Sequence, residues 1–454
     1  MNNNGFLGLD ISKGYADLYV INSDKIPVEA AFRLYDVQDG HQRIEELIDK
    51  WFEKQSFETL YCGVESTGGY ENNWINLLQE LAIKRPLKIA RLNAKGVKSL
   101  SDAALKRTIT DSVSAENIAM YLFDFRHKIK WIDDPQSFKK YTDGRRHNTF
   151  IRMLKKQRIQ LSNQLEKLLY QELSPILTYC RHGAPGWLLN LLLKHSSVAA
   201  INKAGVKGLL KIKGITTEKA EAILNKTRES KHCTSAHISS VIKGTIKQML
   251  HLDETIKEEK NKLIAEYSDS EEVKLLTSIS GLGNQSAVEI LIEIENIHRF
   301  EDAKKLSAYF GLHPVFKQSG DGKWGNHMSK KGRSEIRAVL FMSSLKAIRY
   351  SDLFKNIYSN ARAKGKNHFN AMGVVMHKLL RVIYGVLKNK IAFSQAIDAK
   401  NVENAELKQQ AEKEKSKEQK REQVQKLERY NRAELDHSPI SKRHAKKRKV
   451  LQVT

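Results

Sequence analysis

Cysteine is scarce in this chain and is never closely paired. The 454 residues include only Cys62, Cys180 and Cys233, which lie far apart and form no Cys-x-x-Cys motif. Such spacing supports neither a disulfide framework nor a zinc site built from thiolates. Because free thiols suit a reducing compartment, we expect a cytoplasmic protein.

Long apolar runs are also missing. No stretch approaches the ~20 apolar residues that a membrane-spanning helix requires. The first residues, MNNNGFLGLD, lack the basic start and the apolar core of a secretory signal peptide. We therefore expect no membrane partner.

Acidic residues are outnumbered by basic ones. Lys and Arg total 77 against 52 Asp and Glu, which gives a formal net charge of +25. This field attracts polyanions, and the release of counterions from neutralised phosphates favours binding. Nucleic acid is therefore the leading partner, which predicts a nucleoid-associated protein, and a membrane surface is the weaker alternative. A chain of this length can bury the cores of two or three domains.

Three acidic residues stand at the edges of predicted elements. Asp10 follows a short apolar run on the first strand of a predicted hairpin, whose second strand is Tyr15–Ile21. Glu65 ends another apolar run, and Asp111 begins a predicted helix. Carboxylates at strand ends and a helix start can converge on a divalent metal, because hard oxygen ligands suit Mg²⁺ or Mn²⁺. Single acids usually serve as surface, capping or turn residues, but three in this order favour a metal site for phosphoryl transfer.

Residues 1–140 alternate strand-like and helix-like patterns. Beyond the first hairpin, helical spacing over Gly40–Trp51, Asn72–Ile83 and Asp111–Phe123 alternates with strand patterns at Leu60–Val64 and Leu87–Leu92. This order predicts an α/β domain with a mixed sheet.

Residues 141–270 have the sequence pattern of long charged helices. Phe150–Leu173 and His237–Tyr267 carry apolar residues, Met153 and Ile159 among them, at spacings of three and four. The pattern predicts a helical hairpin or a coiled-coil seam. A helix pair within one molecule and a seam between subunits both fit.

Two segments share a glycine-bearing turn between helical patterns. Lys211–Leu224, within a candidate helix–hairpin–helix at 208–225, has Gly-Ile-Thr, and Leu275–Ile294 has Gly-Leu-Gly. Such a turn exposes backbone N–H groups at a helix start, where Gly281 and Gly283 would hold a phosphate. For the first segment a plain tight turn fits equally well.

The remaining chain divides into a helical domain and a tail. A glycine-rich basic segment at 298–340 is followed by helical patterns at Val339–Arg349 and Ala371–Leu387. Residues 271–395 therefore form a predicted third domain. Residues 396–454 are rich in Lys, Glu and Gln, which predicts a disordered basic tail.

The order of motifs resembles one family. GLDISK, GVESTGGY, TITD-x-x-S-A-x-x-I-A, SISGLGNQSA and GLHPVFKQSG together resemble the Insertion Sequence 110 family of transposases, and Piv-type DNA invertases share this order. The resemblance covers roughly residues 5–125 and 272–345. It implies a RuvC-like, ribonuclease-H-like N-terminal domain, a C-terminal domain with a catalytic serine, and Mg²⁺ dependence. It also implies excision and insertion of a mobile element guided by a structured bridge RNA that pairs with donor and target DNA.

The resemblance also assigns site residues. Asp10, Glu65 and Asp111 match the first three acids of the family's DEDD set, and Ser319 matches its serine. The fourth acid is expected three residues after the third, where this chain has Ser114. That spacing keeps Ser114 on the same helix face as a metal ligand, but its hydroxyl is neutral. The neighbouring Glu116 would point elsewhere on the helix, and Asp102 is another candidate substitute.

Three functions follow. The first is a DNA transposase or recombinase in which metal-bound acids activate the phosphate and Ser319 attacks it. The second is a RuvC-like nuclease that uses metal-activated water, which needs the acids but not Ser319. The third is a catalytically impaired nucleic-acid-binding protein, which Ser114 and the positive charge favour.

The basic segment supplies the predicted nucleic-acid contacts. Glycine permits close backbone approach, Lys and Arg neutralise phosphates, and Trp324 either stacks on a base or anchors its loop. The predicted contacts are Lys317, Gly320, Lys323, Trp324, Lys330, Lys331, Arg333 and Arg337. Two acid sets and two serines in one assembly would require a dimer or a tetramer, and the helices at 150–173 and 237–267 are a candidate seam.

Overall fold

The computed structural model describes residues 3–103, 110–181, 183–228, 235–319, 322–332 and 334–398, without side chains at 316–326. The chain divides into two compact units. The first comprises Met1–Tyr267 with Val288–Glu301, and the second comprises Ser268–Ala287 with the chain from Asp302 onward.

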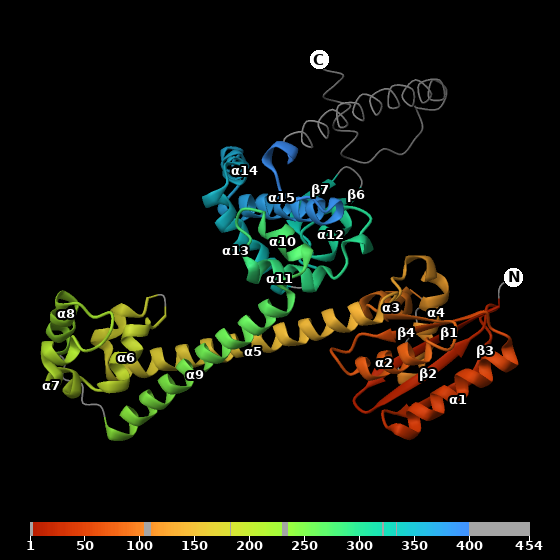
Figure 1. The fold of residues 1–454 in the computed structure, drawn as a ribbon, viewed down its shortest axis with the longest axis horizontal. Helices are drawn as coiled ribbons and strands as arrows, with labels where there is room; N and C mark the ends of the chain where they lie inside the picture. Colours follow the sequence, from red (N-terminus) through yellow and green to blue (C-terminus); the bar gives the residue numbers. More distant parts are fainter. Residues whose placement is uncertain are drawn as a thin grey trace, which may run out of the picture. The chain divides into compact units, whose positions relative to one another are not determined.

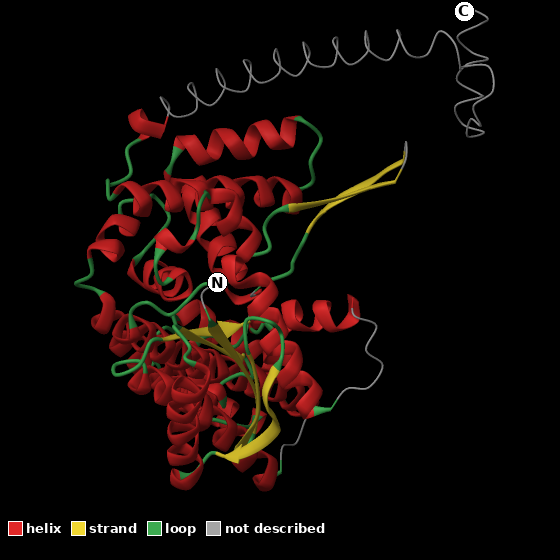
Figure 2. Cartoon of the chain, turned by 90° about the vertical axis from the view of Figure 1, so that its right-hand side faces the viewer, coloured by secondary structure: helices red, strands yellow, loops and turns green. Residues whose placement is uncertain are grey.

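A five-stranded mixed sheet forms the centre of the first unit's N-terminal part (Figures 1 and 2). Its order is β3-β2-β1-β4-β5, with bounds β1 Asn4–Ser12, β2 Tyr15–Ile21, β3 Pro27–Tyr35, β4 Thr59–Glu65 and β5 Leu87–Leu92. β1, β2 and β3 are antiparallel, whereas β4 and β5 run parallel to β1. The predicted mixed α/β domain is confirmed.

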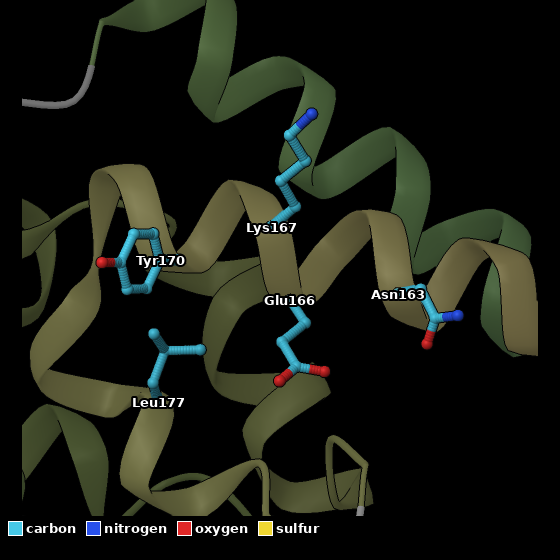
Figure 3. Close-up of a pocket in the computed structure, with 5 residues that line it drawn as sticks. All are labelled: Asn163, Glu166, Lys167, Tyr170 and Leu177. Atoms are coloured by element: carbon cyan, nitrogen blue, oxygen red, sulfur yellow. The ribbon is translucent and has the colours of Figure 1, made fainter.

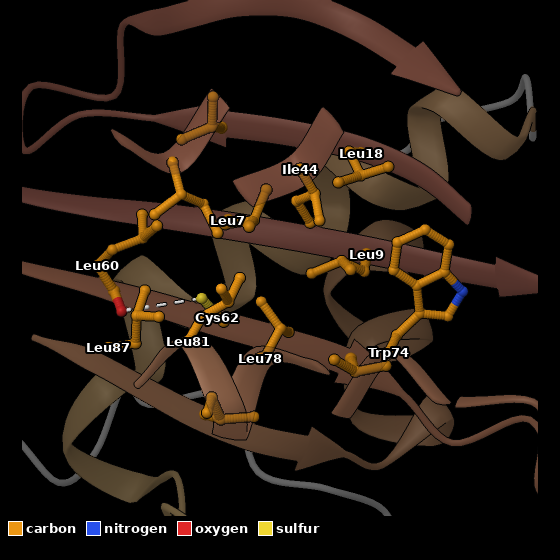
Figure 4. Packing of buried hydrophobic residues seen from close by; sticks show 14 of the residues in the cluster. Leu7, Leu9, Leu18, Ile44, Leu60, Cys62, Trp74, Leu78, Leu81 and Leu87 are labelled. Carbon is orange, nitrogen blue, oxygen red and sulfur yellow. Dashed lines mark hydrogen bonds between the residues drawn. The ribbon is translucent and has the colours of Figure 1, made fainter. Parts of the chain in front are cut away.

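Helices cover both faces of this sheet. α1 (Gln38–Gln55) and α2 (Glu71–Leu81) pack on one face over a core that includes Leu7, Leu9 and Trp74 (Figure 4). α4 (Asp111–Phe125) packs on the other face with Ile118 and Leu122, and α3 (Ala94–Ala103) precedes it. Strand residues alternate between the two cores because successive side chains point to opposite faces.

Two elements of this domain were not predicted. β3 is an edge strand and nearly all of its residues are at least partly exposed, so it lacks the alternating apolar pattern that identifies a half-buried strand. α3 buries only Val97, so its helical spacing is equally faint.

Two long helices pair beyond the sheet (Figure 1). α5 (Pro135–Glu172) begins well before the predicted Phe150, because Pro135 follows an Asp134 side chain that accepts a hydrogen bond from the Ser137 amide at 3.0 Å. α9 (Ala236–Tyr267) follows the prediction closely. The two helices pack on each other within one chain, while Met153 and Ile159, which were assigned to the apolar seam, are exposed.

A small helical module, hereafter the head, joins α5 to α9. It consists of η2 (Ser174–Tyr179), α6 (Gly186–Lys194), α7 (Val198–Leu209) and α8 (Thr217–Arg228), together with the first half of α9 up to Leu250. Leu188, Leu192, Ile201, Ile223 and Ile242 share its core. The predicted helical middle region is therefore confirmed.

The second unit is mainly helical. Its elements are α10 Glu271–Thr277, the start of α11 Asn284–Ile294, α12 Ala303–Tyr309, β6 Pro314–Ser319, β7 Gly322–Met328, α13 Ser334–Tyr350, α14 Asp352–Ala363 and α15 His368–Asn389. Two short 3-10 helices, η1 (Arg126–Lys128) and η3 (Ile297–Arg299), belong to the first unit. β6 and β7 form a hairpin that extends away from the helices of its unit (Figure 2). α15 forms the centre of the helical packing, with Val375, Leu379 and Ile383 buried.

The structure bears on the expectations about the cysteines, membrane-spanning helices and the C-terminal tail. Cys62 and Cys180 are free and buried, and Cys233 lies outside the described residues. Within the described ranges, every helix is too short or too polar to cross a membrane. The tail from residue 399 onward lies outside the description.

Candidate functional site

Two glycines allow α4 to lie close against the sheet. A Cβ atom on Gly8 of β1 would lie 2.2 Å from the Ala115 carbonyl oxygen and 2.6 Å from the Ala119 nitrogen. A Cβ on Gly63 of β4 would lie 2.9 Å from the Leu122 side chain, and Gly63 pairs with Gly8 in register. The side-by-side glycines therefore form a flat surface on which the helix backbone rests.

This packing brings the first turn of α4 to the ends of β1 and β4. Asp10 lies two residues beyond Gly8, and Glu65 lies two residues beyond Gly63, so both belong to the face that α4 covers. Asp111 is the first residue of α4, and Ser114 lies one turn later. Residues from three separate elements thus converge at one end of the sheet.

The start of α4 is fixed by a local cap. The Thr110 hydroxyl accepts a hydrogen bond from the Val113 amide at 3.3 Å, which is a typical helix N-cap. The positive end of the helix dipole stabilises the Asp111 carboxylate in the first turn. The cap also orients Asp111 and Ser114 toward the strand ends, because residues three apart share a helix face.

Asp10 shows that these groups are close together. The pKa of its carboxyl group is raised to about 6, first by burial and then by the neighbouring charges of Glu65, Asp111 and Asp17. A side-chain hydrogen bond from Ser114 acts in the opposite direction. Burial also raises the pKa of Glu65. The crowded carboxylates thus repel one another in the absence of a cation.

Arg33 partly relieves this repulsion and was not predicted. Its guanidinium donates to Asp17 at 2.9 and 3.2 Å and to Asp111 at 3.0 Å. It also stacks on the Tyr15 ring, and the Tyr15 hydroxyl lies 3.4 Å from Asp111. Asp17 faces Arg33 across β2 and β3 and faces Asp10 across β1 and β2. This cross-strand register was not visible in the sequence because β3 was not predicted.

The donor set fits a hard divalent cation by its chemistry. Three carboxylates and a hydroxyl are oxygen ligands of the kind that Mg²⁺ and Mn²⁺ prefer. Within the ranges that the structure describes, however, no three His, Cys, Asp or Glu side chains are grouped tightly enough to hold a metal ion. One reason is that the Asp111 carboxylate is directed to Arg33. The acids are therefore neighbours, but they do not form a closed cage.

The loop that follows Glu65 is held by a second buried acid. Glu71, whose pKa is lowered by its hydrogen bonds and by Arg91, accepts from the Gly69 amide at 2.7 Å and from the Thr67 hydroxyl at 3.0 Å. Arg91 lies 3.4 Å from the same carboxylate. Gly68 and Gly69 have φ values of +90° and +141°, which favour glycine. Glu71 thus fixes the chain direction directly after Glu65, a role that sequence analysis missed.

Ser319 lies at the end of β6, where it pairs with Gly322. It belongs to the second unit, whereas the acids belong to the first. Its side chain lies outside the described part, as do those of Lys317, Lys323 and Trp324 in the same hairpin. Gly320 and Arg333 fall outside the described residues altogether.

The other predicted contacts of the second unit have varied surroundings. Lys330 and Lys331 are exposed beside the hairpin, and Lys330 has a φ of 53°. Arg337 donates to the carbonyl oxygens of Phe310 and Gly332, at 3.2 and 3.0 Å, so it fixes the loop between α12 and α13.

The two glycines of the predicted Gly-Leu-Gly turn, Gly281 and Gly283, have different surroundings. A Cβ on Gly281 would lie 2.6 Å from the Ala347 nitrogen, so α13 packs where a side chain would be. Its φ of +99° gives a second reason for glycine. Gly283 has open space around it, and its carbonyl accepts from the Ala287 amide at the start of α11. Of the two, only Gly283 offers an open approach to a helix start.

Two surface hollows lie along α5, away from these residues. One, of about 330 Å³, is lined by Asn163, Glu166, Lys167, Tyr170 and Leu177 (Figure 3). Glu166 and Lys167 point in opposite directions there, so polar groups do not converge. The other, of about 430 Å³, is lined by residues of α5 and α9. Neither hollow contains a residue of the acidic site.

Comparisons with known proteins agree with this geometry. Residues 7–173, which contain all three acids, match a model of DEDD-type transposases of IS110 elements. Residues 273–359, which contain Ser319, match the model described as the transposase IS116/IS110/IS902 family. The chain belongs to this transposase family. The family resemblance that the sequence motifs indicated is therefore confirmed.

Curated relatives from bacteria match parts of the chain. A protein of insertion element IS116 from Streptomyces clavuligerus is 22% identical over 246 residues, which cover 53% of this chain and 62% of the relative. The pilin gene-inverting protein of Moraxella bovis is 30% identical over 126 residues, which cover 27% of this chain and 39% of the relative. The transposase for insertion sequence element IS1111A from Coxiella burnetii is 27% identical over 164 residues, which cover 35% of this chain and 44% of the relative. The chain spans less than two thirds of each of these family members.

Proposed function

We propose that this chain is a DNA transposase or recombinase of a mobile insertion sequence. The observation that carries the proposal is the convergence of Asp10, Glu65 and Asp111 at one end of the sheet, within the region that matches DEDD-type transposases. Relatives named for insertion elements and for gene inversion support DNA as the substrate. Such a protein acts in the cytoplasm, at the nucleoid.

The acids and Ser114 would hold Mg²⁺ or Mn²⁺. When bound, the metal polarises the scissile phosphate and stabilises the charge that develops on it. Asp10, Glu65 and Asp111 supply negative oxygen ligands, and Asp111 must turn away from Arg33 to do so. Ser114 adds a neutral oxygen in place of a fourth carboxylate.

Ser319 is the proposed nucleophile of strand exchange. Its hydroxyl loses its proton as a bond forms between Oγ and the phosphorus, one bridging P–O bond breaks, and the released strand end keeps that oxygen and takes up a proton to become a hydroxyl. Lys317, Lys323, Lys330, Lys331 and Arg333 would neutralise the strand, Gly320 would permit close approach, and Trp324 would stack on a base or anchor the hairpin. We assign Arg337 to shaping the neighbouring loop, because it donates to two backbone carbonyls.

Further partners are part of this proposal. A structured bridge RNA would pair with donor and target DNA, and a dimer or tetramer would supply two acid sets and two serines. The turn at Gly283, as part of a helix–hairpin–helix, would bind a phosphate through the exposed start of α11. The exposed Met153 and Ile159 on α5 are candidates for contacts between subunits.

A strand-exchange assay tests the nucleophile. Ser319→Ala should abolish exchange and the covalent protein–DNA adduct while DNA binding persists. Ser359→Ala, at an exposed position of α14, is the matched control and should exchange normally. An adduct that persists in Ser319→Ala would refute the assignment. Cleavage without exchange in that variant would identify a nuclease that uses metal-activated water.

A second function is favoured by one observation. Ser114 takes the place of the fourth acid and hydrogen-bonds to Asp10, so the chain could be an impaired enzyme that only binds nucleic acid. Ser114→Asp tests this alternative. A gain of exchange from an inactive parent would support decay from an active ancestor, whereas an active parent would rule out impairment.

A further inference from the structure

The head lies outside both family matches. The first match ends at residue 173 and the second begins at residue 273. The head nevertheless has its own core, in which Leu188, Ile201 and Ile223 are fully buried. It is therefore a folded module to which the family comparison assigns no role.

Its surface carries an excess of positive charge. Glu218 and Glu221 are the only acids among its described residues. The exposed cations are Arg181, Lys194, Lys203, Lys207, Lys211, Lys213, Lys226, Arg228 and Lys247. Such an imbalance on a small module attracts a polyanion.

Among the described residues of the head, these cations form no ion pair with a carboxylate. Along α5 and α9, by contrast, Arg158 pairs with Asp253 at 3.1 Å and His147 with Glu259 at 2.7 Å. In the described residues of the head, no carboxylate lies within 4.0 Å of a Lys or Arg nitrogen. The two long helices thus hold some of their charges in ion pairs, which the described residues of the head lack.

Neutral groups hold two of the lysines in place. Lys219 Nζ donates to the Gly214 carbonyl at 3.0 Å and lies 4.7 Å from the Trp187 ring centre. Lys226 Nζ donates to the Thr178 hydroxyl at 2.9 Å. Lys194 and Lys243 lower the pKa of His195, in addition to the effect of burial. The positive charges of the head therefore outweigh its two described acids, Glu218 and Glu221.

The turn between α7 and α8 presents lysines at an open surface. Residues 210–216 connect the two helices, and Gly214 has a φ of +92° while packing against Trp187. Lys211 and Lys213 are exposed on this turn, and Lys207 precedes it on α7. Lysine is a flexible point charge, which suits phosphate contacts that do not read bases.

We propose that the head binds the phosphate backbone of duplex DNA through Lys207, Lys211 and Lys213. Single strands are recognised by stacking on exposed aromatic rings, and the described residues of the head expose no large aromatic side chain. The choice of DNA rests on the proposed function, whereas the choice of a polyanion rests on the unpaired charges. This contact is separate from the acidic site and extends the footprint of the protein beyond the cleaved phosphate.

The test is a salt titration of DNA affinity with the full chain in metal-free buffer. The triple variant Lys207→Gln/Lys211→Gln/Lys213→Gln should bind a random-sequence duplex of about 30 base pairs roughly tenfold more weakly than the native chain. The slope of log K plotted against log salt concentration should also be smaller in magnitude by about 2–3. The matched control is Lys54→Gln/Lys84→Gln/Lys88→Gln, which removes the same charge from exposed positions of the N-terminal domain. It should leave both quantities nearly unchanged.

Three outcomes would overturn the proposal. One is an unchanged slope in the head variant with its helical content preserved by circular dichroism. Another is an equal loss in the control variant, which would show a diffuse effect of net charge. A third is weaker binding of an RNA hairpin of similar charge with unchanged DNA binding, which would make RNA the partner. Since no cleavage is measured, an inactive acidic site would leave these results unaffected.

Discussion

Asp10 is the residue on which the candidate site depends most. It is partly buried, and three other carboxylates, those of Glu65, Asp111 and Asp17, raise its pKa further. Arg33 is the cation that contacts this group, and it is directed to Asp17 and Asp111. A site that leaves like charges crowded is typical of a place where a divalent cation, or a substrate with its cation, binds.

The raised pKa predicts how stability depends on pH. Because the folded state holds the Asp10 proton more tightly than the unfolded state, the free energy of unfolding falls as the pH rises from 3.8 to about 6 and stays low above that. Asp10→Asn removes this effect. After a discount for solvent screening, we expect the metal-free variant to be more stable than the native chain by about 1–2 kcal/mol at pH 7.5.

Denaturant unfolding at pH 4 and pH 7.5 measures this difference. The variant and the native chain should converge at pH 4, where Asp10 is protonated. Saturating Mg²⁺ or Mn²⁺ should then raise the melting temperature of the native chain and not that of the variant. If the variant were less stable than the native chain at pH 7.5, repulsion between the crowded carboxylates around Asp10 would be contradicted.

Glu71 predicts a loss of stability of a different kind. Its buried carboxylate accepts hydrogen bonds from the loop after Glu65 and pairs with Arg91. Glu71→Gln would remove the negative charge that lies 3.4 Å from Arg91 and accepts the loop hydrogen bonds, so we expect the free energy of unfolding to drop by about 3 kcal/mol. Thermal unfolding measures this loss of stability, and Glu53→Gln, at an exposed position, is the control. Equal melting temperatures for the two variants would show that the loop does not need the carboxylate.

At the scale of elements, the contact between α4 and the sheet decides the geometry of the site. Gly8 and Gly63 lie side by side, and α4 rests directly on them. The distance between helix and strand sets how far Asp111 and Ser114 lie from Asp10. The distance between helix and sheet therefore sets the distance between the candidate metal ligands.

Gly8→Ala tests this contact. The added Cβ would lie 2.2 Å from a backbone oxygen, so α4 must shift, and we expect a loss of about 3 kcal/mol or more. The matched control is Gly244→Ala in α9, where the new methyl group meets open space and should stabilise the helix by up to about 1 kcal/mol. Chemical denaturation of both variants measures the difference. A Gly8→Ala chain with native stability would mean that α4 packs less closely than described.

At the scale of the molecule, net charge and division into units dominate. The formal charge of +25 is a property of the whole chain, and the head concentrates part of it in a module outside the family matches. The acids belong to one unit and Ser319 to the other. The proposed serine mechanism therefore takes its acids and its nucleophile from different units.

The charge predicts the salt dependence of binding by the native chain. If the chain neutralises 6–10 phosphates, its affinity for duplex DNA should fall by about 10³–10⁵ between 50 and 200 mM salt. Fluorescence anisotropy with a labelled duplex measures the slope. An affinity that hardly changes with salt would indicate that apolar or base contacts dominate instead.

The sequence by itself determined the candidate site residues and the elements that hold the acids among them. The hairpin with Asp10, the strand before Glu65 and the helix that begins at Asp111 were predicted because apolar periodicity is local and survives in a single sequence. Family motifs then pointed to Ser114 and Ser319. The edge strand β3 was missed because its exposed residues carry no such pattern.

Only the tertiary structure decided what surrounds those residues. The ion pairs of Arg33, the loop contacts of Glu71 and the close approach of α4 to Gly8 join residues far apart in the chain. A strand pairing or a helix–sheet distance depends on the whole packing, and no local pattern encodes it. The same reason explains the head, whose charges become a surface only when its helices share a core.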